Sequence, residues 1–184
     1  MPQLASVETT PLYSLARFTD VDSLNQDLLS GFSAAQNAPD TRKDHFFAGR
    51  YENIYVSSTQ CPALKILRQH ILACATDLLG KPQSVLRYGA WFNAMQPGDV
   101  TEAHHHDDFD EVISAVYYIQ CAPQCGDLIL LPDGDAAVHI EPQVGNTVFF
   151  SPALEHAVAQ NRSQQLRLSV GINIGMSLND DPDS

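Results

Sequence analysis

The pattern of hydrophobic and polar positions changes once along the chain, near residue 83. Before that point, apolar residues recur every three or four positions in two stretches, as they do along one face of a helix. After it, they fall into short extended runs separated by glycine and proline. The pattern therefore predicts an N-terminal helical part over about 1–82 and a β-rich part over about 83–176.

Two helices are expected in the N-terminal part. The first spans about 22–36 and begins at Asp22, a residue type favoured where helices start. The second spans about 62–80, where Pro62 suits a first helical turn and Gly80 marks the end. The segment between the two helices has no steady period and is predicted to be mostly loop.

Seven extended runs follow the second helix, with turn sequences such as "PGD", "PDGD" and "PQVG" between them and no helical pattern. Short strands at such intervals are typical of an antiparallel sandwich or barrel. We therefore predict a mostly β fold, a double-stranded β-helix or jelly roll with two helices packed outside it, in a single domain over 1–184. The runs cover about 84–96, 111–120, 127–131, 136–140, 146–151, 156–160 and 166–175.

The composition excludes some partners. The net charge of −12 argues against a nucleic acid or an anionic membrane, because phosphate binding needs clustered Lys and Arg. No window approaches a membrane span of about 20 apolar residues, and the N-terminus does not resemble a signal peptide, so we expect a cytoplasmic protein. The sequence leaves a homodimer open.

The charge is also unevenly distributed. From Tyr88 onward, only Arg162 and Arg167 oppose fourteen acids. Arg162 lies in the polar stretch "QNRSQQ", which is typical of a solvated turn, whereas Arg167 lies within the apolar run "LRLSVGINI". Arg167 therefore needs an anionic partner, and the acidic surroundings favour a neutral or cationic substrate on steering grounds.

A histidine-rich stretch, "EAHHHDDFDE", lies between two predicted extended segments. Alternation along an extended chain puts His104, His106 and Asp108 on one face and His105 with Asp107 on the other. A further ligand must come from another strand, and His156, just after the apolar run "TVFF", is the best candidate. The sequence therefore predicts a metal site at the mouth of the roll.

Two histidines and one carboxylate on a β scaffold, with coordination positions left open, are typical of non-haem Fe(II) oxygenases. Ser169 follows Arg167 by two positions and so lies on the same face of the strand. A guanidinium with a nearby hydroxyl suits the far end of a dicarboxylate, because guanidinium binds carboxylate in a bidentate way.

The run from Tyr88 to about residue 175 resembles the 2-oxoglutarate- and Fe(II)-dependent oxygenase family of double-stranded β-helix proteins. The matching pieces are Trp91 and Asn93 in a Trp-x-Asn strand, Gly98 in a turn, the His-x-His or His-x-Asp element, "SAVYY", "FFSPALEH", and the Arg-x-Ser strand ending in Asn173.

This resemblance implies a dioxygenase that uses Fe(II) and 2-oxoglutarate and hydroxylates an unidentified small-molecule or peptide substrate, with release of succinate and carbon dioxide. It implies that His156 is the distal iron ligand and that Arg167 and Ser169 hold the distal carboxylate of 2-oxoglutarate. It also implies that Asn93 and Tyr118, or Tyr117, line the cosubstrate pocket.

Two registers of the histidine element stay open. Counting forward from Gly98 places the motif on His104 and His106, whereas counting backward from Ser114 places it on His106 and Asp108. We favour His106, Asp108 and His156, because a carboxylate stabilises ferrous iron better than a third neutral imidazole. The alternative set replaces Asp108 with His104.

Two other classes compete with the oxygenase interpretation. "GDVTEAHHHDDFDE" also fits the first motif of cupins, metal-dependent jelly-roll proteins that do not use 2-oxoglutarate, with Glu111 as an additional ligand beside His104, His106 and His156. A metal-free binding module with solvated histidines is the third possibility. The pair of Arg167 and Ser169 favours the oxygenase, because a cupin has no need of it.

Overall fold

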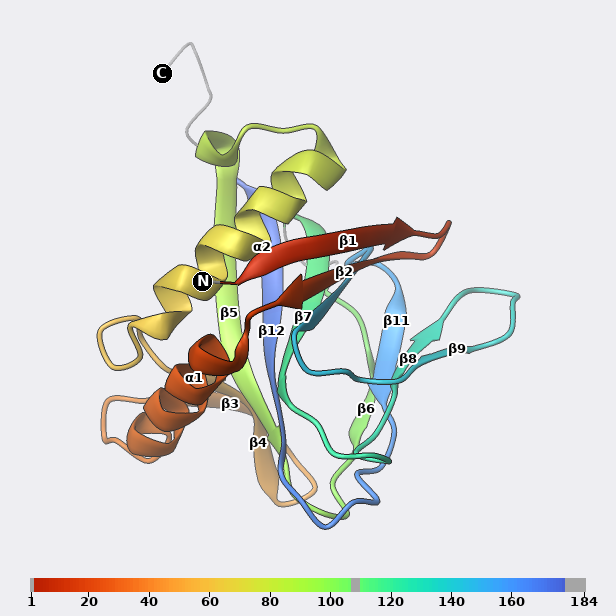
Figure 1. Ribbon diagram of the computed structural model, residues 1–184. Helices are drawn as coiled ribbons and strands as arrows, with labels where there is room; N and C mark the ends of the chain where they lie inside the picture. The colour runs from red at the N-terminus through yellow and green to blue at the C-terminus, as the bar shows by residue number, and fades with distance from the viewer. Residues whose placement is uncertain (1, 107–109, 178–184) are drawn as a thin grey trace.

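A computed structural model describes residues 2–106 and 110–177. Its strands form two antiparallel sheets, and its two helices lie against the larger sheet (Figure 1). The predicted architecture, mostly β with two helices packed outside the roll, is confirmed. Neither helix among the described residues is long and apolar enough to cross a membrane.

The larger sheet has eight strands and the smaller sheet four. In spatial order the larger sheet contains β1 (Gln3–Thr9), β2 (Tyr13–Thr19), β10 (Asn146–Phe150), β7 (Glu111–Gln120), β12 (Arg167–Met176), β5 (Leu86–Met95), β4 (Arg50–Tyr55) and β3 (Arg42–Phe47). The smaller sheet contains β6 (Thr101–His104), β11 (Glu155–Val158), β8 (Leu128–Leu131) and β9 (Val138–Ile140).

Both predicted helices are present, as α1 (Asp22–Ala35) and α2 (Ala63–Leu79), and a short 3-10 turn, η1 (Gln83–Val85), follows α2. Helix α1 begins at Asp22 as predicted, but Asp22 does not cap it, because Asp22 is the first helical residue and no side chain caps this end. An acid in the first turn still interacts favourably with the helix dipole. Helix α2 ends as predicted at Gly80, whose left-handed φ of 60° suits glycine.

The main hydrophobic core lies between the helices and the larger sheet. Phe32 of α1 packs on Phe92 of β5 with ring centroids 5.0 Å apart, and both are almost fully buried. A buried hydrogen bond joins the same layers, because the Tyr117 hydroxyl of β7 donates to Asn25 Oδ1 of α1 at 2.7 Å. These contacts fix α1 on β5 and β7, two strands that contribute residues to the site.

The N-terminal part also contributes four strands that the sequence pattern did not predict. Strands β1 and β2 extend the larger sheet at one edge, and β4 and β3 extend it at the other. Neither of the two outermost strands has a buried residue, and edge strands of this kind lack the apolar alternation that identifies a strand in a sequence. The stretch predicted to be mostly loop is therefore the hairpin β3–β4.

A second apolar cluster lies between the two sheets. It brings Tyr118 and Val148 of the larger sheet against Leu128, Leu130 and Ile140 of the smaller sheet. The remaining space between the sheets is a cavity, and its lining comes from both of them.

Candidate metal centre and anion pocket

Two histidines are brought together by the pairing of two short strands. Strand β6 runs antiparallel to β11, with His104 opposite His156 in the register. Their ring centroids are 4.3 Å apart. Residues 52 positions apart in sequence thus become neighbours, because a paired position on adjacent strands places side chains on the same face.

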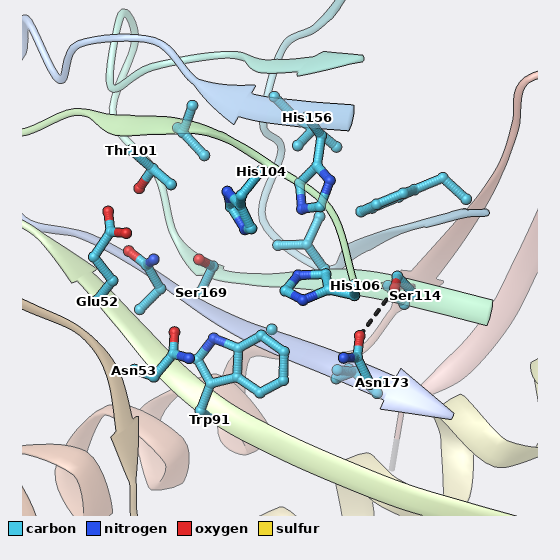
Figure 2. Close-up of a pocket in the computed structure, with 18 of the residues that line it drawn as sticks. Glu52, Asn53, Trp91, Thr101, His104, His106, Ser114, His156, Ser169 and Asn173 are labelled. Carbon is cyan, nitrogen blue, oxygen red and sulfur yellow. Dashed lines mark hydrogen bonds between the residues drawn. The ribbon is translucent and has the colours of Figure 1, made fainter. Parts of the chain in front are cut away.

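His106 completes the cluster from the segment that follows β6. Its backbone N–H donates to the carbonyl of Pro152 at 2.8 Å, which ties this segment to the turn before β11. Its ring lies 4.9 Å from the His104 ring and 5.1 Å from the His156 ring. One ligand atom from each of the three imidazoles lies within 4.8 Å of the others, so the three can share one metal ion (Figure 2).

Two of the imidazoles are held in the tautomer that a metal needs. His104 Nδ1 lies 2.9 Å from the carbonyl of Glu102, and His156 Nδ1 lies 3.0 Å from the carbonyl of Leu154. Because a carbonyl oxygen only accepts, each Nδ1 carries the proton and each Nε2 keeps its lone pair. Burial, followed by the neighbouring His104, lowers the pKa of His156 to about 3, so this ring is a neutral ligand at physiological pH.

Aromatic rings pack around the three histidines. The Phe150 ring lies 4.7 Å from the His156 ring, and the Trp91 indole lies 5.7 Å from the His106 ring. Gly171, opposite Trp91 on β12, makes room for the indole, because a Cβ at this position would lie 2.6 Å from the indole ring. This packing restricts the imidazoles to a narrow range of orientations.

The other predicted metal ligands lie elsewhere. His105 is exposed, which fits its predicted place on the opposite face. Asp108 lies outside the described residues, so its part in the site stays a prediction. Glu111, the additional cupin ligand, does not join the histidine cluster; its carboxylate lies 3.8 Å from Arg87 of β5, across the intervening strand β12.

Arg167 is buried, and no carboxylate of residues 2–106 or 110–177 forms an ion pair with it. It is 1% exposed, and its Nη1 donates to Ser169 Oγ at 3.1 Å and to Met95 Sδ at 3.7 Å. Its Nε and Nη2 have no hydrogen-bond partner among the described residues. Buried donors without a partner are costly, and a buried cation more so. The arginine therefore has the character of one half of an anion-binding site.

The predicted neighbours of Arg167 fall into two groups. Ser169 and Asn93 are opposite each other on β12 and β5, and both line the cavity together with Arg167. Tyr118 is not part of the lining. Its fully buried ring lies 5.3 Å from the Arg167 guanidinium, and its hydroxyl also has no partner among the described residues.

These features fit 2-oxoglutarate. The three histidines offer neutral nitrogen ligands to a divalent ion, and the two free positions of Arg167 offer a fork for a carboxylate in the same cavity. A molecule with a metal-chelating end and a distal carboxylate would satisfy both.

Sequence reasoning missed two charged residues of the site, Arg50 and Glu52 on β4. Arg50 Nη2 donates to Glu52 Oε1 at 2.8 Å and to Thr101 Oγ1 at 2.9 Å, and its Nε lies 3.6 Å from Asp99. Glu52 lines the cavity. Arg50 and Glu52 are two positions apart and share a face of β4, but that strand was not predicted. The contacts of Arg50 with the loop before β6 and with its start had no local signal, because those partners lie about fifty positions away.

No family model matches the sequence, and no curated protein matches it significantly. Solved structures do match over most of the chain. The non-heme alpha-ketoglutarate-dependent carbocyclase SnoK from nogalamycin biosynthesis has a TM-score of 0.72 at 16% identity, over 90% of this chain and 79% of that one. The epimerase SnoN from the same biosynthesis has a TM-score of 0.70 at 18% identity, over 88% and 76%.

A prolyl-4-hydroxylase from Pseudomonas putida is also similar, with a TM-score of 0.63 at 17% identity, over 89% of this chain and 91% of that one. SnoN is known in complex with Fe3+ and alpha-ketoglutarate. These likenesses show that the chain has the fold of 2-oxoglutarate- and Fe(II)-dependent oxygenases, and the resemblance noted in the sequence is confirmed at the level of fold.

Proposed function

We propose that the protein is a non-haem Fe(II) oxygenase that uses 2-oxoglutarate as cosubstrate and hydroxylates a small molecule or a peptide. The observation that carries this proposal is the presence, in one cavity, of three convergent imidazoles and of a buried arginine with unused donors. Imidazoles alone would equally suit a cupin-type metal protein. Arg167 favours the oxygenase, because a cavity without an anionic ligand gains nothing from a buried cation.

Each residue of the site has a distinct role in this proposal. When bound, Fe(II) would supply the redox chemistry by which dioxygen, as the oxidant, gives one oxygen atom to 2-oxoglutarate, forming succinate and carbon dioxide, and the other to a C–H bond of the substrate. The imidazoles would hold the ion through their unprotonated nitrogens. Arg167, oriented by Ser169, would bind the distal carboxylate of the cosubstrate. Trp91 and Phe150 would keep the histidines in place and exclude water.

Two ligand sets are compatible with this function. The set His104, His106 and His156 is supported by the mutual proximity of the three rings. The set His106, Asp108 and His156 is supported by the charge argument, because a carboxylate reduces the net charge of the ferrous centre from two to one. The geometry of the described residues favours the first set.

Metal content of purified variants separates the two sets. We expect His104→Ala and His156→Ala to lose bound iron, as measured by elemental analysis, while Asp108→Ala keeps it. His105→Ala is the matched control, because this neighbouring imidazole is exposed. Loss in Asp108→Ala with retention in His104→Ala would establish the carboxylate set. Retention of iron in His156→Ala would contradict a metal centre at this place.

Turnover tests the cosubstrate. Purified protein with Fe(II) and ascorbate should convert 2-oxoglutarate to succinate slowly even without a prime substrate, and NMR or mass spectrometry can follow the product. A protein that binds iron but never forms succinate would favour the cupin-type alternative.

A further inference from the structure

The cavity contains a carboxylate that the proposed chemistry does not use. Glu52 lies on β4, in the hairpin outside the central strands, and its side chain is 14% exposed. Figure 2 shows Glu52 beside Thr101, with the His104 ring facing the same space. A carboxylate so placed costs solvation energy, and that cost needs a compensating contact.

Arg50 compensates it only in part. One oxygen of Glu52 accepts a hydrogen bond from Arg50, and the other accepts none from the described residues. Arg50 is in turn shared with Asp99, whose carboxylate lies 3.6 Å from its Nε. The three groups together carry a net charge of −1, so Arg50 does not neutralise both carboxylates.

The residues around Glu52 are suited to a positively charged ligand group. Asn53 lines the cavity and offers an amide oxygen as acceptor, and Trp91 lies beside it (Figure 2). Asn93 lines the cavity too, and its amide oxygen accepts a hydrogen bond from Arg50 at 3.5 Å. An indole ring attracts an ammonium group through its quadrupole. Carboxylate, amides and indole together are the surroundings that a protonated amine needs when it leaves water.

We propose that Glu52 binds a cationic nitrogen of the prime substrate, so that the substrate is a small molecule or a peptide side chain with a protonated amine. This inference rests on the proposed function for the identity of the cavity. Arg167 then binds the diacid on one side, and Glu52 binds the amine on the other. The two opposite charges orient the cosubstrate and the substrate in one cavity.

An anionic substrate fits this wall poorly. The donors of Arg50 are already directed at Glu52, the Val100 carbonyl, Thr101 and Asn93, with Asp99 near its Nε. A second anion would therefore meet the charges of Glu52 and Asp99, and the one Arg50 nitrogen without a hydrogen bond, Nε, already lies 3.6 Å from Asp99. The competing interpretation is that Glu52 serves only to anchor Arg50 and the hairpin.

Glu52→Gln separates the two interpretations. The amide keeps an oxygen acceptor for Arg50 but removes the negative charge. Glu102→Gln is the matched control, because it makes the same change on the exposed face of β6, close to the cavity but outside its lining. Thermal melting of all three proteins verifies that they are folded.

Binding is measured without turnover, on protein loaded with Zn(II) and 2-oxoglutarate. The probes are butylammonium and 1-butanol, which differ chiefly in charge, and saturation-transfer NMR reports their binding. A charge-assisted hydrogen bond contributes about 1.5 kcal/mol, so we expect the wild-type protein to favour butylammonium about tenfold. This preference should disappear in Glu52→Gln and persist in Glu102→Gln. If the wild type bound the two probes equally, the proposal would be overturned even if the variant failed to fold. It would also be overturned if Glu52→Gln still preferred butylammonium.

Replacing Zn(II) with Mn(II) locates the bound amine. In the wild type, the paramagnetic ion should strongly enhance the proton relaxation of bound butylammonium. If the relaxation rate in the Mn(II)-loaded protein is not enhanced, the amine binds at the outer surface and the proposal is overturned. Calorimetry of Zn(II) and 2-oxoglutarate on the same samples tests the proposed function separately. If it detects no 2-oxoglutarate, the oxygenase assignment fails, while the butylammonium comparison still decides the role of Glu52.

Discussion

The two arginines at the cavity carry the same charge but differ in what their N–H groups meet. Arg50 meets two carboxylates, a hydroxyl and a backbone carbonyl, and its one nitrogen without a hydrogen bond, Nε, lies 3.6 Å from Asp99. Arg167 meets one hydroxyl and a thioether, and two of its nitrogens have no hydrogen-bond partner among the described residues. Arg167 is also the more deeply buried of the two.

This difference indicates different purposes. A buried cation whose donors are occupied by the protein contributes to the folded structure, because its desolvation is repaid within the chain. A buried cation whose donors are unoccupied contributes little stability by itself and is explained by a ligand. Arg50 therefore belongs to the framework of the cavity wall, and Arg167 belongs to a binding site.

The largest expected effect concerns Arg167→Ala. Removing one member of a buried charge pair costs about 2–5 kcal/mol, so the affinity for 2-oxoglutarate should fall by that amount. Calorimetry on the Zn(II)-loaded protein measures the change, and Arg162→Ala provides a control at an exposed arginine. If Arg167→Ala bound 2-oxoglutarate as tightly as the wild type, the two arginines would not differ in function. That result would favour the cupin-type alternative.

Arg50→Ala should act on stability. It leaves Glu52 and Asp99 without their shared partner and detaches β4 from the start of β6, so we expect a loss of about 1–3 kcal/mol in the free energy of unfolding. Urea unfolding measures this loss.

The variant Arg167→Met should be as stable as the wild type or more stable when both are metal-free. The substitution removes a buried cation that has no carboxylate partner among the described residues. If Arg167→Met lost more stability than Arg50→Ala, the contrast between the two arginines would be contradicted.

A smaller effect is expected for Ser169→Ala. The Ser169 hydroxyl accepts a hydrogen bond from Arg167 Nη1, and removing it leaves a further donor of the guanidinium unpaired. We expect the affinity for 2-oxoglutarate to fall by about 1 kcal/mol, which is the contribution of one hydrogen bond. Ser58→Ala, at an exposed serine, should change neither affinity nor stability measurably.

Much of the fold could be predicted from the sequence because it follows from local periodicity. The sequence pattern predicted the apolar stripe of α2, the turn at Gly80 and the extended runs that form β5, β7 and β12. The hairpin β3–β4 could not be predicted from the sequence pattern. It lies at the edge of the sheet, joins β5 through a single bridge between Ile54 and Phe92, and shows no apolar alternation.

The site was predictable to the extent that residue types narrow the chemistry. Histidines 104, 106 and 156 and an arginine within an apolar strand are few enough to be picked out by inspection. Alternation along the chain assigns His104, His106 and Asp108 to one face, but it cannot tell which of them faces His156. That choice depends on the pairing of β6 with β11.

The sequence by itself determined the two helices, the central strands and the short set of groups able to bind a metal and a diacid. Only the tertiary structure decided which distant charges meet, such as Arg50 with Asp99, and which arginine nitrogens lack a partner among the described residues. The physical reason is that burial of apolar residues is encoded by spacing along one segment, whereas the pairing of polar groups depends on how distant strands cross. The character of this cavity therefore became visible only when the strands were placed in space.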